Sequence, residues 1–439
     1  MTTEYKERSL SLTGAVAMGT GVMIGAGIFA LVGQIAELAG SAFPWIFAVA
    51  ALVTGLSAYS YVKLSNAYPS AGGIAMFLEM AYGRSALTAS AGLLMAFSMV
   101  INESLVARTF GTYTAQLLGG ADTGPLAPTL GVALIAVAFA INLSGNRLVG
   151  GLSLVMAVAK VVGIAALAMA GFVAAQSLEI PVTTGNVEPS VLGFIAALAL
   201  GVLAFKGFTT ITNSGSEIVD PHRNVGRAIV WSIMICVVIY LLVALAVNAS
   251  LSLPEIVAAR NYALAEAARP TFGEMGRTLT IVLAMVATAS GLLASMFAVS
   301  RMLTMLTDMK LIPHRHFGMP GGIQTHILVY VAGVAILLTV FFDLGRIASL
   351  GAMLYLVMDL TVHWGVIRHL RAKVGASVVV VGLAIVLDVV ILGGLVALKL
   401  QTDMLIVAVA VALMTVIYFA ERKFLSLSAS QPQAAHPGH

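Results

Sequence analysis

Residues 18–29 read MGTGVMIGAGIF, an apolar stretch in which glycines recur every few positions. Residues 203–217, LAFKGFTTITNSGSE, form a second such stretch with Gly207, a run of threonines and Gly215. Glycine disfavours an α-helix by about 1 kcal/mol per residue relative to alanine, and β-branched threonine adds a smaller cost. Both stretches therefore predict helices that are interrupted along their length.

The composition around these stretches is that of a membrane protein. Of 439 residues, 60% are hydrophobic and 10% are charged, whereas soluble domains carry roughly 25% charged residues. Apolar runs long enough to cross a bilayer recur along the chain, so we expect an all-α membrane protein with about twelve transmembrane helices. The expected spans are 13–33, 42–66, 86–117, 126–144, 149–175, 191–214, 227–250, 278–307, 326–342, 346–367, 375–398 and 402–420.

The charged residues lie between the apolar runs and predict the topology. The net charge is +4, and most lysines and arginines fall on one side of the expected bundle, which the positive-inside bias places in the cytoplasm. We therefore expect both termini in the cytoplasm, a multi-pass protein of the plasma membrane (the cell inner membrane), and no nucleic-acid partner. Residues 1–9 lack the pattern of a cleavable signal peptide, and the polar tail 425–439 is expected to be disordered.

Interrupted helices at membrane depth point to a binding site. Unwound backbone is tolerated there only where it is buried in protein or lines a cavity. Its free N–H groups can bind a carboxylate and its free carbonyls a cation, so a zwitterionic amino acid suits both. The same glycines could instead serve close helix packing. However, the interruptions fall in spans one and six, the same place in two five-helix halves, which favours an inverted-repeat transporter.

Three motifs in order along the chain resemble the amino acid–polyamine–organocation (APC) superfamily. They are GVMIGAGIF at 21–29, GFTTITNSGSEIVDPHRNVGRAI at 207–229 and SRMLTMLTDMKLIP at 300–313. The resemblance implies a LeuT-type fold, a 5+5 inverted repeat with two peripheral helices. The implied units are a cytoplasmic N-terminus (1–12), a first repeat (13–175), a second repeat (191–367) and a peripheral pair (375–420).

The resemblance also implies where the substrate binds. Its carboxylate would meet backbone N–H groups, and its ammonium would meet carbonyls, of the two interrupted spans. Phe205 stands where the family often has an aromatic ring that closes over the substrate, although ordinary packing is an alternative. The implied substrate-binding residues are Met23, Ile24, Gly25, Ala26, Gly27, Phe205, Gly207 and Phe208.

Lys160 lies in the middle of the fifth expected span. An ionisable residue costs at least about 2.5–3.5 kcal/mol at the bilayer centre, so it is a candidate for function unless its stem reaches an interface. In the proton-coupled transporters that this sequence is similar to, a lysine here replaces a cation between the first, fifth and eighth spans. Burial favours the neutral amine, so Lys160 is the expected proton-coupling residue.

Two further charges depart from the family pattern. Lys206 lies inside the interrupted sixth span, and Glu103 lies in the third span. They are expected either to form a charge pair or to act at the site, by contacting a substrate side chain or carrying protons. Arg108 competes as the partner of Glu103. Glu217 and Arg301 are expected at an inner gate.

Other classes of function find little support in the sequence. No Gly-x-Ser-x-Gly, HExxH or phosphate-cradling motif occurs, so we expect neither an enzyme nor an ATP-driven pump. His363 is expected to be a core or interfacial histidine, and we expect no metal and no cofactor. The predicted partners are an amino acid, a proton and the lipid bilayer. A carrier of polyamines or other organic cations, and an amino acid exchanger, remain alternatives.

Overall fold

The computed structural model describes residues 10–70, 72–119, 124–143, 160–173, 190–313 and 322–430. Within these ranges the chain is helical, and its extended pairing is an isolated bridge between Leu10 and Ile218. Ten helical stretches of the described chain are long and apolar enough to cross a membrane. The all-α multi-pass fold class is therefore confirmed, while the count of twelve and the inverted repeat remain predictions.

The long helices follow the apolar runs of the sequence. The fifth expected span, 149–175, is described only over Lys160–Val173. The last helix continues into the predicted tail, because Leu425 and Leu427 are helix-favouring residues that extend its final turns; residues 431–439 lie outside the described chain. The long helices are α1 (Leu12–Ala39), α2 (Phe43–Ala67), α4 (Ala86–Leu117), α5 (Leu126–Leu143), α7 (Val191–Phe205), α9 (Pro221–Ser250), α12 (Arg269–Asp308), α13 (Ile323–Phe341), α14 (Leu344–Gly365), α16 (Val378–Thr402) and α17 (Met404–Ser430).

Short elements connect or interrupt these helices. The pair α10 and α11 lies in the long connection between α9 and α12. Ser252 caps α10 and bonds the Glu255 carboxylate, and these hydrogen bonds lower the pKa of Glu255. The short elements are η1 (Gly40–Ala42), α3 (Gly73–Tyr82), η2 (Lys206–Phe208), α8 (Thr209–Thr212), η3 (Gly215–Glu217), α10 (Leu253–Ala258), α11 (Ala263–Ala267), η4 (Val366–Leu370) and α15 (Arg371–Val374).

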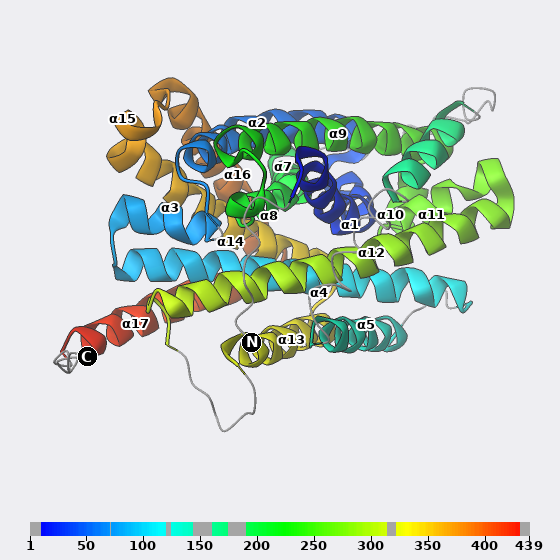
Figure 1. Ribbon diagram of the computed structural model, residues 1–439. Helices are drawn as coiled ribbons and strands as arrows, with labels where there is room; N and C mark the ends of the chain where they lie inside the picture. The colour runs from blue at the N-terminus through cyan, green and yellow to red at the C-terminus, as the bar shows by residue number, and fades with distance from the viewer. Residues whose placement is uncertain are drawn as a thin grey trace.

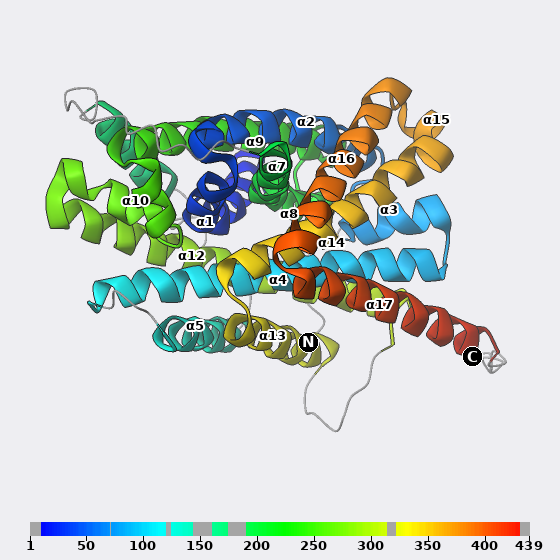
Figure 2. The ribbon, with the colours of Figure 1, turned by 180° about the vertical axis from the view of Figure 1, so that it is seen from behind.

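The long helices lie side by side in one bundle. In Figure 1, α2 and α9 run along one face and α5 and α13 along the opposite face, with α4 and α12 between them. Figure 2 shows the same bundle from behind, with α1 and α7 enclosed by their neighbours. The elements α10 and α11 lie at one end of the bundle, and α3 and α15 lie at the other.

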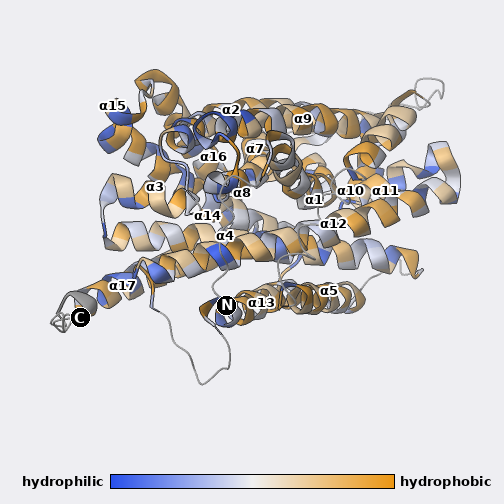
Figure 3. Ribbon diagram, viewed as in Figure 1, coloured by the Kyte–Doolittle hydropathy of each residue, from blue (hydrophilic) through white to orange (hydrophobic). Residues whose placement is uncertain are grey.

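The bundle has the surface that a bilayer requires. Apolar residues cover the shafts of the helices, and polar residues gather at the ends, around α15 and α11 (Figure 3). On α9, Trp231, Met234 and Val238 recur at helical spacing and are 58%, 54% and 56% exposed. Such a continuous apolar stripe is typical of a lipid-facing surface.

Both predicted interruptions are present. Within α1, Ile24 has non-helical angles of φ −80° and ψ 33°. The sixth span breaks after Phe205 into η2, α8 and η3. Both breaks are buried inside the bundle, and α1 packs directly against α7, η2 and α8.

Glycines outside the breaks let helices approach closely. A Cβ atom on Gly111 of α4 would lie 1.9 Å from the carbonyl oxygen of Ala127 on α5. A Cβ atom on Gly55, in the interior of α2, would have no other atom within 4 Å. The two glycines therefore test packing separately from helix propensity.

We expect Gly111→Ala to destabilise the protein by about 1–3 kcal/mol, because the added methyl group forces α4 and α5 apart. Gly55→Ala, the control, should be neutral or stabilising by up to about 1 kcal/mol. Thermal unfolding of the purified variants in detergent measures both effects. Equal unfolding temperatures for the two variants would contradict the packing of α4 on α5.

Candidate functional site

The two interrupted helices touch through bare backbone. A Cβ atom on Gly207 would lie 2.7 Å from the backbone nitrogen of Met23, and one on Gly27 would lie 2.8 Å from the carbonyl oxygen of Ala204. Any larger residue at either position would separate α1 from the break in the sixth span. The glycines thus bring the main chains of both breaks together.

Tyr240 of α9 ties the two breaks to each other. Its hydroxyl lies 2.6 Å from the carbonyl oxygen of Met23 and 3.0 Å from that of Ala204, and it donates to them. Its ring packs on Phe205, with ring centroids 4.9 Å apart. A buried tyrosine hydroxyl normally finds such a partner, but the sequence gives no sign of which carbonyl it binds, so Tyr240 was not among the predicted site residues.

A small cavity lies between the breaks and α4. The space left for a water-sized molecule is about 20 Å³, enough for one water molecule and too small for an amino acid. In this conformation the cavity therefore has no room for an amino acid substrate. The lining residues are Val22, Met23, Gly27, Leu31, Met99, Asn102, Leu105, Leu203, Ala204, Lys206, Gly207, Thr209, Thr210 and Ser295.

The predicted substrate-binding residues divide into two groups. Met23, Gly27 and Gly207 line the cavity, and the other predicted residues are not among those that line it. Ile24 is the kink residue of α1. A Cβ atom on Gly25 would lie 3.5 Å from the carbonyl oxygen of Ala287, so this glycine faces α12.

The two predicted aromatic residues do not line the cavity but pack on tyrosine rings. Phe205 packs on Tyr240, and Phe208 packs edge-on against Tyr61 at 5.3 Å between ring centroids. Ala26 lies in the same helix as Gly25, and its side chain lies outside the described part of the structure. Neither aromatic ring closes over the cavity in this conformation.

Lys160 joins three helices at one point. Its ammonium donates hydrogen bonds to the Gly21 carbonyl of α1 and to the Ser290 hydroxyl of α12, the latter at 2.9 Å. The side chain is buried, and its residue is 1% exposed. The lysine therefore lies between the first, fifth and eighth expected spans, with the break of α1 one turn away.

The expected direct pair between Glu103 and Lys206 is not formed. Lys206 donates to the Ser98 hydroxyl and lies over the ring of Tyr355 at 5.5 Å. Both carboxylate oxygens of Glu103 are buried without a hydrogen-bond partner, and the two charges interact only beyond ion-pair distance. The ammonium of Lys206 therefore bonds to the hydroxyl of Ser98 and not to the carboxylate of Glu103.

Arg108 does not take the place of Lys206. It donates to the carbonyl oxygen of Thr339 at 2.8 Å. Glu103 is therefore a buried acidic group beside the cavity without a close counter-charge among the described residues.

The end of the site near the start of α1 is closed by an ion pair and a short backbone bridge. Arg301 of α12 pairs with Glu217 of η3, with side chains 14% and 20% exposed. Leu10 accepts a hydrogen bond from the backbone of Val219 and donates one to that of Glu217, at 2.9 and 2.8 Å. These contacts fasten the start of α1 to the end of the sixth span.

The opposite end is closed by the connection that carries α10 and α11. A Cβ atom on Gly33 would lie 2.2 Å from the carbonyl oxygen of Arg260. Arg260 also pairs with Glu37 at 2.7 Å, and Gln34 donates to Asn261 at 2.8 Å. Contacts at the two ends of the bundle thus hold both the start and the second half of α1.

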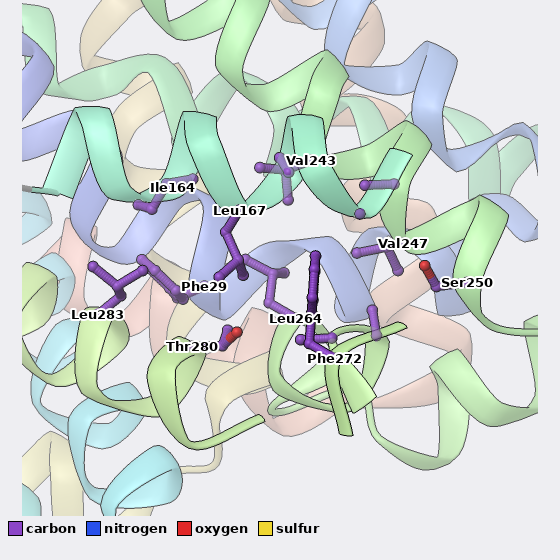
Figure 4. Close-up of a pocket in the computed structure, with 15 residues that line it drawn as sticks. Phe29, Ile164, Leu167, Val243, Val247, Ser250, Leu264, Phe272, Thr280 and Leu283 are labelled. Atoms are coloured by element: carbon purple, nitrogen blue, oxygen red, sulfur yellow. The ribbon is translucent and has the colours of Figure 1, made fainter. Parts of the chain in front are cut away.

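A second cavity lies beyond Phe29, between the helix over Lys160–Val173, α9 and α12 (Figure 4). It offers about 40 Å³ to a water-sized molecule. Apart from the hydroxyls of Ser250 and Thr280, the side chains that line it are apolar. A zwitterion would leave its charges unpaired there, so this cavity is not the candidate site.

Comparison with known proteins gives consistent matches over most of the chain. The model of the amino acid permease family matches residues 10–419. The inner membrane transport protein YbaT of Escherichia coli is 30% identical over 388 residues, which cover 88% of this chain and 89% of the relative. The cationic amino acid transporter 4, vacuolar, of Arabidopsis thaliana is 26% identical over 257 residues, covering 55% of this chain and 43% of the relative.

A third similar protein comes from an archaeon. It is an uncharacterized protein of Methanocaldococcus jannaschii, 30% identical over 395 residues, which cover 89% of both chains. The similarity therefore extends over both interrupted helices and their surroundings.

The ion pair between Arg301 and Glu217 should behave as one unit. We expect Arg301→Glu and Glu217→Arg each to lower the unfolding free energy in detergent, and the double exchange to restore part of the loss. The expected coupling is about 0.5–3 kcal/mol, the range for residues in contact. Strictly additive losses would show that the two side chains do not interact.

Proposed function

This chain belongs to the amino acid permease family of the APC superfamily, and we propose that it imports amino acids by proton symport, with Lys160 carrying the coupled proton. The family and the similar transporters make it a multi-pass membrane transporter and not an enzyme. The observation that carries the finer proposal is the position of Lys160 between Gly21 and Ser290. The proposed location is the plasma membrane, with both termini in the cytoplasm.

The substrate is recognised through main-chain groups of the two breaks. Backbone N–H groups at Gly25, Ala26 and Gly27 bind its carboxylate, and carbonyls near Met23 and Ile24 and near Phe205 and Phe208 bind its ammonium. The direct contact of the breaks at Gly207 supports this assignment. Because Tyr240 occupies the Met23 carbonyl when the site is closed, substrate entry shifts its hydroxyl towards Ala204 alone.

Protonation of Lys160 controls how firmly α1 is held. The charged ammonium makes charge-assisted hydrogen bonds to Gly21 and Ser290, which are about twice as strong as neutral ones. Loss of the proton weakens both bonds and frees α1 from α12. Burial makes the neutral amine accessible, so one proton moves for each change of conformation.

The closed ends of the bundle support an alternating mechanism. In the proposed cycle, the inner contacts at Glu217 and Arg301 and the outer contacts at Arg260 open in turn around the fixed site. The cavity of about 20 Å³ corresponds to a closed state between these openings.

A cationic substrate is the second candidate, as in a carrier of cationic amino acids or polyamines. Glu103 lies buried with the Ser295 hydroxyl and Lys206 as its polar neighbours, and it has no ion-pair partner among the described residues. A positively charged substrate side chain would neutralise this carboxylate, whereas a neutral one would not. Exchange instead of symport is a further outcome that transport assays distinguish.

We expect Lys160→Ala to abolish the stimulation of uptake by an inward proton gradient, because the group that carries the proton is gone. Lys160→Arg should retain the contacts but lose gradient-driven accumulation, since arginine does not release its proton. Uptake of labelled amino acids into sodium-free proteoliposomes measures both, with Lys423→Ala, at an exposed position, as the control. Uptake in Lys160→Ala that stays gradient-driven would overturn the proton-coupling role.

We expect Glu103→Gln to reduce the preference for arginine and lysine over neutral amino acids by about tenfold, or about 1.4 kcal/mol, if the substrate is cationic. The measurement is competition against labelled substrate in the same proteoliposomes. Glu421→Gln changes another buried carboxylate, on α17, and serves as the control. An unchanged preference would favour a neutral amino acid as the cargo.

A further inference from the structure

Three ionisable side chains meet inside the bundle, away from the substrate cavity. Asp359 and His363 lie one turn apart on α14, and Asp388 lies on the neighbouring α16. One oxygen or nitrogen atom of each lies within 4.8 Å of the others, and all three residues are 0% exposed. This Asp–His–Asp cluster has no role in the proposed transport cycle.

Side chains of α2 hold two of the three in fixed orientations. Ser57 and Tyr61 donate to the two carboxylate oxygens of Asp359 at 2.6 and 2.5 Å. Ser60 lies 2.9 Å from Nδ1 of His363. Because both of its oxygens accept a hydrogen bond, Asp359 is held as a carboxylate, and the other imidazole nitrogen of His363 points at the acids.

His363 and Asp388 present atoms to the cluster that have no hydrogen-bond partner. Nε2 of His363 lies 3.5 Å from one oxygen of Asp359 and 3.5 Å from one oxygen of Asp388, and it makes no hydrogen bond. Neither oxygen of Asp388 has a hydrogen-bond partner. Unpaired polar atoms of this kind are costly to bury.

The spacing is that of ligands around an ion. An imidazolium sharing its proton with a carboxylate would lie about 2.7–2.9 Å from it. Two ligands at tetrahedral positions about 2.0–2.1 Å from a zinc ion lie about 3.4 Å apart. The distances of 3.5 Å from Nε2 of His363 to the two acids match the second arrangement.

We propose that Asp359, His363 and Asp388 bind one divalent transition-metal ion, with zinc as the best fit. Two carboxylates and a neutral imidazole leave no net charge once a divalent ion is bound, which suits a site without access to water. The imidazole ligand favours zinc and its neighbours over sodium, magnesium or calcium. The hydrogen bonds from Ser57, Ser60 and Tyr61 are the outer contacts that normally orient metal ligands.

The ion would fasten α16 to α14 beside the interrupted sixth span. The ring of Tyr61 touches Phe208, and that of Tyr355 lies under the Lys206 ammonium. The site thus stiffens the wall behind the break. This inference is independent of the cargo and of proton coupling.

The test measures metal in the full-length protein, purified in detergent with an affinity tag that contains no histidines. After equilibration with zinc and gel filtration, elemental analysis should give about one zinc per chain. Asp388→Asn and His363→Asn should lower this content at least about tenfold. Glu421→Gln and a chain lacking residues 431–439, which removes the tail histidines, should keep it.

Two readouts cover variants that fail to fold. Tyr61→Phe leaves the ligands in place and should weaken zinc binding by about 10–100-fold, and cobalt should give the strong visible absorption of a tetrahedral site in wild type but not in Asp388→Asn. Less than about a tenth of a zinc per wild-type chain would overturn the proposal and leave water or shared protons between the acids. Zinc that persists in Asp388→Asn and His363→Asn would overturn it as well.

Discussion

The structure depends on satisfying backbone groups where two helices are broken inside the bundle. A bilayer offers no water to an unpaired carbonyl or N–H group, so each break must be covered by protein. Gly207 and Gly27 allow the two breaks to cover each other, because no side chain keeps their main chains apart. The remaining carbonyls at Met23 and Gly21 are bound by Tyr240 and by Lys160.

That constraint explains why so many polar residues of this apolar chain converge on α1. Its middle is bonded by Lys160 and Tyr240, its start is joined to the sixth span at Leu10, and its other end is paired at Glu37 with Arg260. Each of these contacts satisfies a polar group that would lose its partner if α1 moved. Movement of α1 therefore requires a substitute donor for the carbonyls of Gly21 and Met23, and the ammonium of the proposed amino acid substrate can act as one.

The sequence predicted what depends on composition and local propensity. Hydropathy located the long helices, and glycine content located both breaks, since these effects act within one segment. The residues that line the cavity could not be predicted in the same way. Whether Phe205 faces the cavity or packs on Tyr240 depends on how α9 is rotated. Asp359 and Asp388 were missed for a related reason: each is a single acid in its own apolar run, and only packing of α14 on α16 brings them together.

The two buried groups of charges differ in how easily their contacts can be undone. Lys160 holds α1 with one ammonium, and removal of a single proton removes its charge, so this contact can be broken within a transport cycle. The Asp–His–Asp cluster lies between α14 and α16, and hydrogen bonds from α2 fix the orientations of Asp359 and His363. If an ion is bound there, opening that contact would leave several charges unpaired at once, which costs far more than one. The moving part of the molecule is then α1 with the broken sixth span, working against a wall of α2, α14 and α16 that does not open.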